Sequence, residues 1–342
     1  MFKSGLTLLA IVVFSLVANA DDKVGKVESS SAFVLPESRI AYINPVEGAI
    51  YEVDLAGHVT WKYKIPRKLA LSGSLRKGAD IEWLEGPDHF LFVIPESGIY
   101  EVNRQKKVVW SYETTLVSHD ADRLPNGNTI FVNAWDGKKD NQVVEITTAG
   151  KIVFKWKISD SGISCAHKTA NCYRPKRPGG PAGDYTHVNG VEKFKDGSFL
   201  VSLRNLHKVV VIDKDLRVIE RHRQIRAVHD PRLEGGKLIA IARRRGIIAR
   251  DRQKITSRED SSQIFNYQNQ GYTFLRTNER ISPDLVLLTD STHLLIFDRK
   301  SEKIVWKLKL EGFGDQREEK YLPFLYKAAW VGEKEYKKKK GQ

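Results

Sequence analysis

The stretch that decides the fold is IYEVDLAGHVTWKYKI, residues 50–65. It contains an apolar strand, a polar turn and a second strand that carries Trp61. Apolar and polar residues alternate around the turn, which is typical of a β-hairpin. The same plan recurs in the segments that begin at Ile99, Val143, Val209 and Leu294. The chain is therefore expected to be built from repeated hairpins.

The spacing of the repeat indicates the architecture. The tryptophans of the first three hairpins, Trp61, Trp110 and Trp156, are 49 (110 − 61) and 46 (156 − 110) residues apart. This is the period of a four-stranded propeller blade. A second kind of hairpin lies between these segments, with tight turns at 126–127, 196–197 and 235–236. Asn-Gly, Asp-Gly and Gly-Gly pairs favour such turns because they tolerate positive φ.

These repeats predict an all-β protein, a single-domain β-propeller of about six four-stranded blades within residues 33–335. The blades are expected near 33–65, 79–113, 118–158, 186–223, 228–260 and 275–310. The segment FLYKAAWVG (324–332) is expected to return as a strand that closes the ring. Residues 159–185 and 261–274 are expected to be long inter-blade loops.

The N-terminus indicates export. Residues 1–20 contain Lys3, an apolar run from Leu8 to Val17 and a small-residue site at 18–20, which together predict a secretory signal peptide. An uncleaved anchor is the alternative. Residues 21–32 are expected to be an N-terminal extension and 336–342 a basic tail. The protein is expected to be periplasmic or secreted, with no transmembrane segment after signal cleavage.

The charge balance points to anionic partners. The formal net charge is +14. A basic exported protein commonly meets anionic small molecules, acidic polymers or lipid head-groups. The sequence contains no nucleic-acid recognition motif, so nucleic acid is not expected to be a partner.

The two cysteines, Cys165 and Cys172, lie in SCAHKTANC. In an oxidising compartment they are expected to form a disulfide. A metal pair with His167 is the alternative, although a structural zinc site usually needs four ligands.

Three histidines occupy related places in three successive blades. His119, His187 and His229 precede the turn glycines of their blades by 8 (127 − 119), 10 (197 − 187) and 7 (236 − 229) residues. Arg204 and Arg243 each follow a turn glycine by 7 residues (204 − 197 and 243 − 236). Because a propeller aligns equivalent positions around one axis, these side chains are expected to meet at the central channel. The other histidines in or beside the hairpins are expected at the surface: His58, His89, His207, His222 and His293.

This set of side chains can bind a tetrahedral anion. Guanidinium offers paired donors to anionic oxygens, and imidazole or the amide of Asn189 can add others. A neutral histidine beside the anion can act as a nucleophile. Two alternatives are a merely polar channel lining and a three-histidine zinc site. Arginines would repel a cation, so no metal is expected.

At these residues the sequence resembles the bacterial aryl-sulfate sulfotransferases, which are exported, quinoprotein-like propellers. The matching segments are SHDADRLPNGNTIFVN (118–133), DYTHVNGVEKFKDGSFLVSLRNLHKVVVID (184–213) and RAVHDPRLEGGKLIAI (226–241). The second of these is the most specific, with a His-x-Asn, an Asp-Gly turn and a Ser-x-Arg-Asn. The resemblance covers roughly residues 40–310.

The resemblance implies sulfuryl transfer from an aryl sulfate to an acceptor phenol, with His229 as the transiently sulfated nucleophile. His119, His187, Asn189 and Arg204 would hold the sulfuryl oxygens. Arg243 is expected to add a substrate contact from its spacing alone, because the stretch 242–246 departs from the family's pattern. No cofactor is implied, and no nucleotide sulfate donor. The alternatives are a non-catalytic binding scaffold of the cell envelope and a hydrolase of sulfate or phosphate esters.

Overall fold

The computed structural model describes residues 23–30, 37–70, 74–133, 142–161, 163, 186–242, 246–251, 261–265, 275–314 and 323–332. Within these ranges the chain forms β-strands and three short 3-10 helices, η1 (Leu75–Lys77), η2 (Ile158–Ser161) and η3 (Arg204–Leu206). Neighbouring strands in each sheet are antiparallel. None of the described helices is long and apolar enough to cross a membrane.

The strands form six sheets, which are the blades of a propeller. Blade 1 contains β2 (Arg39–Asn44), β3 (Ala49–Asp54), β4 (Val59–Lys64) and, as its innermost strand, β25 (Ala328–Val331). Blade 2 contains β5 (Asp80–Leu84), β6 (His89–Ile94), β7 (Gly98–Val102) and β8 (Val108–Glu113). Blade 3 contains β9 (Val117–Arg123), β10 (Thr129–Asn133), β11 (Val143–Ile146) and β12 (Ile152–Trp156).

The second half of the ring repeats this order. Blade 4 contains β13 (Val188–Lys193), β14 (Phe199–Leu203), β15 (Lys208–Ile212) and β16 (Val218–His222). Blade 5 contains β17 (His229–Glu234), β18 (Lys237–Ala242), β19 (Gly246–Asp251) and β20 (Ser261–Phe265). Blade 6 contains β21 (Asn278–Arg280), β22 (Leu285–Thr289), β23 (His293–Asp298) and β24 (Lys303–Leu310), with β1 (Gly25–Ser30) added outside β24.

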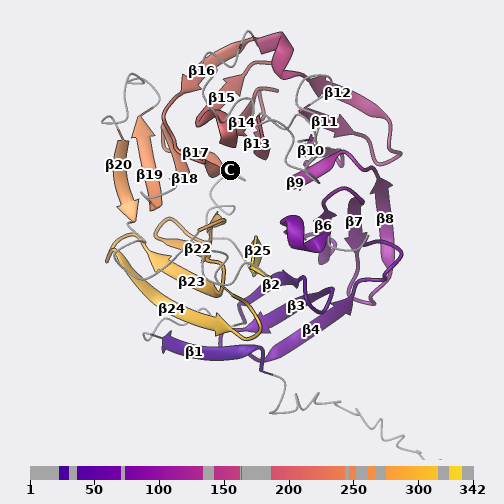
Figure 1. Ribbon diagram of the computed structural model, residues 1–342, viewed down its shortest axis with the longest axis vertical. Helices are drawn as coiled ribbons and strands as arrows, with labels where there is room; N and C mark the ends of the chain where they lie inside the picture. The colour runs from indigo at the N-terminus through magenta and orange to yellow at the C-terminus, as the bar shows by residue number, and fades with distance from the viewer. Residues whose placement is uncertain are drawn as a thin grey trace, which may run out of the picture.

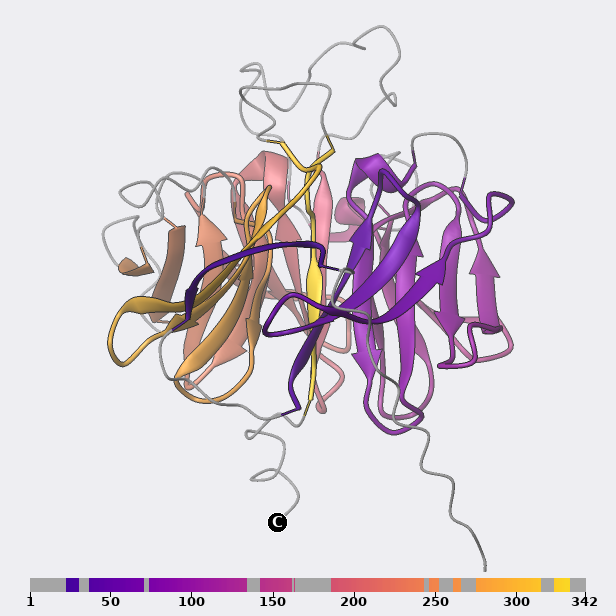
Figure 2. The same cartoon turned by 90° about the horizontal axis from the view of Figure 1, so that it is seen from below.

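Figure 1 shows the six sheets arranged around a central axis, and this confirms the predicted all-β propeller. In the perpendicular view β25, drawn in yellow, runs close to that axis (Figure 2). The predicted closing strand is confirmed, since β25 pairs with β2 from Arg39↔Val331 to Tyr42↔Ala328. The ring is closed a second time at its outer edge, because β1 pairs with β24. The expected N-terminal extension therefore contains a strand of the last blade.

The core lies between the blades rather than within them. Six buried apolar clusters fill the six interfaces between neighbouring blades, including the interface between blades 1 and 6. The middle strands are buried on both faces, as the patterns of β10, β14 and β18 show. This explains why those strands are apolar runs rather than alternating segments.

The repeated tryptophans join each blade to the next. The indole N–H of Trp61 donates to the carbonyl of Arg104 at 3.0 Å, and that of Trp110 donates to Thr148 at 2.7 Å. Trp306 of blade 6 likewise donates to Leu55 of blade 1 at 2.8 Å. Each bond spans one blade boundary, so the tryptophan repeat is a repeat of inter-blade contacts.

Three sequence expectations need correction. Trp156 does not occupy the same position as the other outer-strand tryptophans. In blade 1, Trp61 pairs with Glu52 of the neighbouring strand, whereas in blade 3 the equivalent Glu145 pairs with Phe154. The segment expected to be a loop at 261–274 begins with β20, whose backbone pairs with β19 without the apolar alternation that marks other strands. His222, expected at the surface, is fully buried.

Candidate active site

The innermost strands bring the predicted histidines to one end of the channel. His119 lies near the start of β9, His229 is the first residue of β17, and His187 directly precedes β13. These strands belong to three consecutive blades. His187 has a positive φ of 45°, a backbone conformation that non-glycine residues rarely adopt. Such strain is concentrated at functional sites.

His119 is packed between two rings. Its ring centroid lies 5.1 Å from that of His187 and 5.0 Å from that of Tyr326, which precedes β25. The Nδ1–H of His119 donates to the Gly78 carbonyl at 3.0 Å, so the neutral ring has its lone pair at Nε2. Burial, and then the neighbouring His187, hold the pKa of His119 well below its usual range.

Gly78 makes this packing possible. Its φ is +103°, and an added Cβ would lie 2.8 Å from the Tyr326 ring and 2.9 Å from Nδ1 of His119. Both the backbone conformation and the close approach therefore require glycine at this position.

His229 has one defined tautomer. Its Nδ1 donates to the carbonyl of Ala227 at 2.9 Å, while Nη1 of Arg276 donates to its Nε2 at 2.9 Å. Since guanidinium has no acceptor, Nε2 must be the lone-pair nitrogen. Burial, and then the charges of Arg276 and Arg204, hold the pKa of His229 well below its usual range. His229 is thus a neutral, buried imidazole with a lone pair directed into the site.

The segment before His229 is fixed by two side chains. Nδ1 of His207 lies 3.0 Å from the Ala227 nitrogen and 3.1 Å from the Arg204 carbonyl oxygen; as the acceptor of the Ala227 N–H it carries the lone pair and makes no bond to that carbonyl. Nδ2 of Asn189 donates to the Val228 carbonyl at 3.1 Å. Asn189 is itself fixed, because its Oδ1 accepts from Ser202 Oγ at 2.6 Å. His207, expected at the surface, therefore supports the carbonyl that sets the tautomer of His229.

Two arginines supply positive charge here. Arg204 begins η3 and donates to Oδ1 of Asn205 at 3.0 Å. It is close enough to lower the pKa of both His119 and His229. The guanidinium carbon of Arg276 lies 5.4 Å from the ring centroids of Phe324 and Tyr326. The side chains at this end of the channel are accordingly cationic or neutral.

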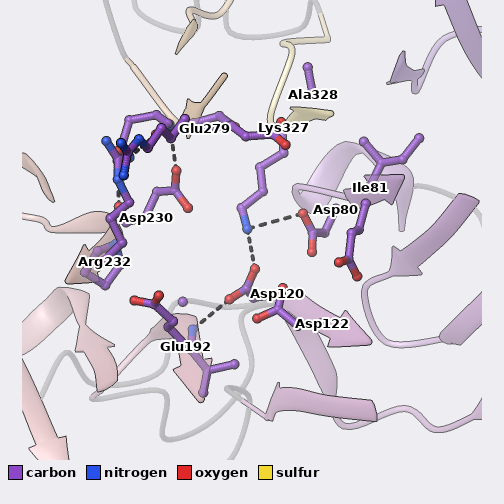
Figure 3. Close-up of a pocket in the computed structure, with 17 residues that line it drawn as sticks. Asp80, Ile81, Asp120, Asp122, Glu192, Asp230, Arg232, Glu279, Lys327 and Ala328 are labelled. Carbon is purple, nitrogen blue, oxygen red and sulfur yellow. Dashed lines mark hydrogen bonds and ion pairs between the residues drawn. The ribbon is translucent and has the colours of Figure 1, made fainter. Parts of the chain in front are cut away.

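Carboxylates and a lysine lie next to the site residues: Asp120 and Asp230 directly follow His119 and His229, Lys327 directly follows Tyr326, and Asp80 begins β5. Lys327 forms an ion pair with Asp120, and its Nζ lies 3.2 Å from Asp80 (Figure 3). Burial raises the pKa of Asp120 to about 7, against the opposite effect of Lys327. Burial alone would lower the pKa of Lys327, but the two carboxylates hold it well above its usual range.

A cavity of about 240 Å³ adjoins this ion pair, and Asp122 and Glu192 are among its lining residues (Figure 3). Arg232 and Arg280 line the cavity as well, so this part of the channel holds both carboxylates and cations, whereas the side chains described at the histidine end are cationic or neutral.

The structure leaves several predictions untested. Arg243, Cys165, Cys172 and His167 lie outside the described residues, so the substrate contact and the disulfide stay predictions. Among the residues that are described, no three His, Cys, Asp or Glu side chains form a group that could hold a metal ion.

Sequence reasoning missed Arg276 and Tyr326. Arg276-Thr277-Asn278 repeats the pattern of His187-Val188-Asn189, with arginine in place of histidine. Attention to the pattern rather than to the residue type would have found it. Tyr326 lies in the predicted closing strand segment, but its place at the channel follows only once that segment is known to be the innermost strand of blade 1.

Together these side chains have the chemistry that a tetrahedral oxyanion requires. Two guanidinium groups can hold anionic oxygens, while the lone pair of His229 Nε2 can attack the central atom. The donors are buried or half-buried, so their interactions with an anion would be stronger than in water.

Comparisons with known proteins agree on the fold and identify a family. The solved structures that the chain resembles include a protein of unknown function from Bacteroides caccae, with a TM-score of 0.55, 13% identity and coverage of 86% of this chain and 99% of that one. Another is a streptogramin B lyase, with a TM-score of 0.50, 10% identity and coverage of 85% of each chain. At such identities the likeness concerns the fold alone. No curated protein matches the sequence.

The family match covers residues 29–220, more than half of the chain, and includes His119, His187, Asn189 and Arg204. Membership suggests an aryl sulfotransferase-like function with small-molecule aryl sulfate and phenol substrates. The chain belongs to the arylsulfotransferase (ASST) family.

Proposed function

We propose that this protein transfers a sulfuryl group from an aryl sulfate to a phenol through a covalent intermediate on Nε2 of His229. The observation that carries the proposal is the tautomer of His229. Its Nδ1–H is held by the Ala227 carbonyl, which leaves a nucleophilic lone pair on a buried, neutral ring beside two arginines.

In the first half-reaction, Nε2 forms a bond to sulfur as the bond from sulfur to the aryl oxygen breaks. The aryl oxygen keeps the bonding pair, leaves as a phenolate and takes a proton from water. Arg204 and Arg276 stabilise the charge on the sulfuryl oxygens. One preorganised donor of this kind contributes about 3–4 kcal/mol to the transition state.

In the second half-reaction, the oxygen of an acceptor phenol attacks sulfur and the N–S bonding pair returns to Nε2. The phenol must lose its proton. His119 suits this step, because its neutral ring has Nδ1–H bonded to Gly78 and a lone pair at Nε2. The proton that the acceptor releases balances the one that the departing phenolate takes up. His187 and Asn189 would complete the sulfuryl site.

We place this reaction outside the cytoplasm. The support is residues 1–20, which have the charge and apolar run of a signal peptide, and the cysteine pair 165 and 172, which suits an oxidising compartment.

The test is incubation with a chromogenic aryl sulfate, with and without added phenol. Without acceptor, the peptide that contains His229 should gain one sulfuryl group, as measured by mass spectrometry. His229→Ala should abolish transfer, whereas Arg204→Ala should retain activity reduced by about 10²–10³-fold. Release of inorganic sulfate at a rate independent of phenol would favour an ester hydrolase. Absence of both adduct and turnover across a panel of aryl sulfates would favour a binding scaffold.

A further inference from the structure

Arg276 is a site residue outside the segment that matches the family. Its Nη1–H points at the lone pair of His229 Nε2, with 2.9 Å between the two nitrogens. This is the lone pair that the proposed reaction uses. A nitrogen that accepts a hydrogen bond cannot attack an electrophile with the same electron pair.

We propose that Arg276 caps the nucleophile: it covers His229 Nε2 in the substrate-free protein and swings onto the oxygens of an anionic donor, which uncovers the lone pair. The cap itself is inferred from the geometry of the substrate-free site alone. Its release by a sulfuryl group rests on the proposed function.

The aromatic neighbours of Arg276 are compatible with such a movement. The side chain is 6% exposed, and its guanidinium lies against the rings of Phe324 and Tyr326. Contacts with aromatic faces favour a cation without fixing the direction of its N–H groups. The guanidinium can therefore exchange one hydrogen-bond acceptor for another while it keeps both aromatic contacts.

An oxyanion has the affinity needed to release the cap. A hydrogen bond from guanidinium to an anionic oxygen is roughly twice as strong as one between neutral groups. A ligand shifts a conformational equilibrium only through its different affinity for the two states. A sulfuryl group meets this condition, because its oxygens gain donors from Arg276 as Nε2 is uncovered. Water and uncharged electrophiles offer no such gain.

The consequence is selectivity for the charge of the donor. Esters with a tetrahedral oxyanion should activate His229, whereas neutral acylating compounds should meet a covered nitrogen. Among the described residues, the charged or titratable groups that lower the pKa of His229 include Arg276, Arg204 and His187, and the ring of Tyr326 lies 6.5 Å away.

Diethyl pyrocarbonate tests the cap without any substrate, because it is an uncharged electrophile that modifies neutral imidazole. The rate at which the His229 peptide is modified would be measured by mass spectrometry from pH 5 to 8.5. In Arg276→Met, which keeps a long side chain but removes donors and charge, the plateau rate should rise about tenfold or more, the range expected for loss of a hydrogen bond to a charged group. Arg280→Met, in the neighbouring strand β21, should react like the wild type.

The pH dependence separates the charge of Arg276 from its hydrogen bond. Arg276→Lys keeps the charge, so it should change the pH midpoint of modification less than Arg276→Met does. A plateau rate in Arg276→Met equal to that of the wild type would overturn the proposal. Turnover of an aryl sulfate should fall by about 10²–10³-fold in Arg276→Met, because a donor is lost as well as a cap.

The modification of His229 tests the cap, and the turnover of an aryl sulfate tests sulfuryl transfer, so the two proposals can fail separately. Faster modification of His229 in Arg276→Met, together with no turnover by the wild type, would support the cap and contradict sulfuryl transfer. Normal turnover by the wild type with unchanged modification in Arg276→Met would contradict the cap alone.

Discussion

Replacing Gly78 by alanine tests how the site is assembled. The φ of Gly78 is +103°, and an added Cβ would lie 2.8 Å from the ring of Tyr326 and 2.9 Å from Nδ1 of His119. A left-handed backbone costs an alanine about 1–2 kcal/mol. Inserting a methyl group into a well-packed site costs about 1–3 kcal/mol more. We therefore expect Gly78→Ala to lower the free energy of unfolding by about 2–5 kcal/mol.

The same change should reduce activity beyond its effect on stability. Both rings must move to admit the methyl group, and His119 must move while its Nδ1–H stays bonded to the Gly78 carbonyl. A displacement of about 1 Å in an active site can cost about 10²-fold in rate. Activity would be measured as single-turnover transfer in buffer without urea, in which the variant is still folded. Stability would be measured separately by urea denaturation.

Gly86 provides the matched control. It lies in the turn between β5 and β6, and a Cβ added there would meet no atom within 4 Å. Gly86→Ala should change the free energy of unfolding by no more than about 0.5 kcal/mol. Equal stability and equal turnover in the two variants would refute the packing argument. A destabilised Gly78→Ala with full activity would show that the position of His119 does not limit transfer.

Three further predictions concern the charge pair, the nucleophile and the outer strand. Lys327→Met leaves the carboxylates of Asp80 and Asp120 buried without their cation, so it should lower the free energy of unfolding by about 3–5 kcal/mol in urea denaturation. Adding Asp120→Asn to this variant should recover part of the lost stability. No recovery in the double variant would contradict the ion-pair reasoning. The lowered pKa of His229 keeps its ring neutral as the pH falls, so the acid limb of kcat/KM should lie well below pH 6.5. A limb at or above pH 6.5 that moves in His229 variants would contradict a buried, neutral His229. Deleting residues 21–30 removes β1, which lies on the outer edge of blade 6, so the urea midpoint should fall while kcat measured without urea stays within about twofold of the wild type.

The fold was predictable because its signals are local and repeated. Each hairpin carries its own turn residues and alternation, so the five similar outer hairpins reinforce one another. The same logic explains what was missed. The sequence of β20, SSQIF, has no such signal, because an outer strand needs only backbone pairing with its neighbour. The sequence of β1, GKVESS, is equally polar and pairs with β24 at the outside of the ring.

Site residues were predictable only where one characteristic residue type recurred at equivalent positions of the blades. His119, His187 and His229 stand out because three of the nine histidines recur at related places in successive blades. Arg276 does not stand out by residue type, because the chain has many basic residues and only its position before Thr277-Asn278 repeats the pattern of His187. Tyr326 depends on a pairing between strands almost 300 residues apart in sequence (Tyr42↔Ala328), which no local pattern reveals.

The position of β25 has a consequence for the order of folding. This strand follows blade 6 in sequence but completes blade 1, and the residues directly before it, Tyr326 and Lys327, contact the site and its charge pair. Contacts between distant parts of a chain form slowly, because their loop must close first. The site should therefore be the last part of the protein to form. In refolding experiments, sulfuryl transfer should reappear later than the circular dichroism of the sheets, so activity would report the closing of the ring rather than the folding of its blades.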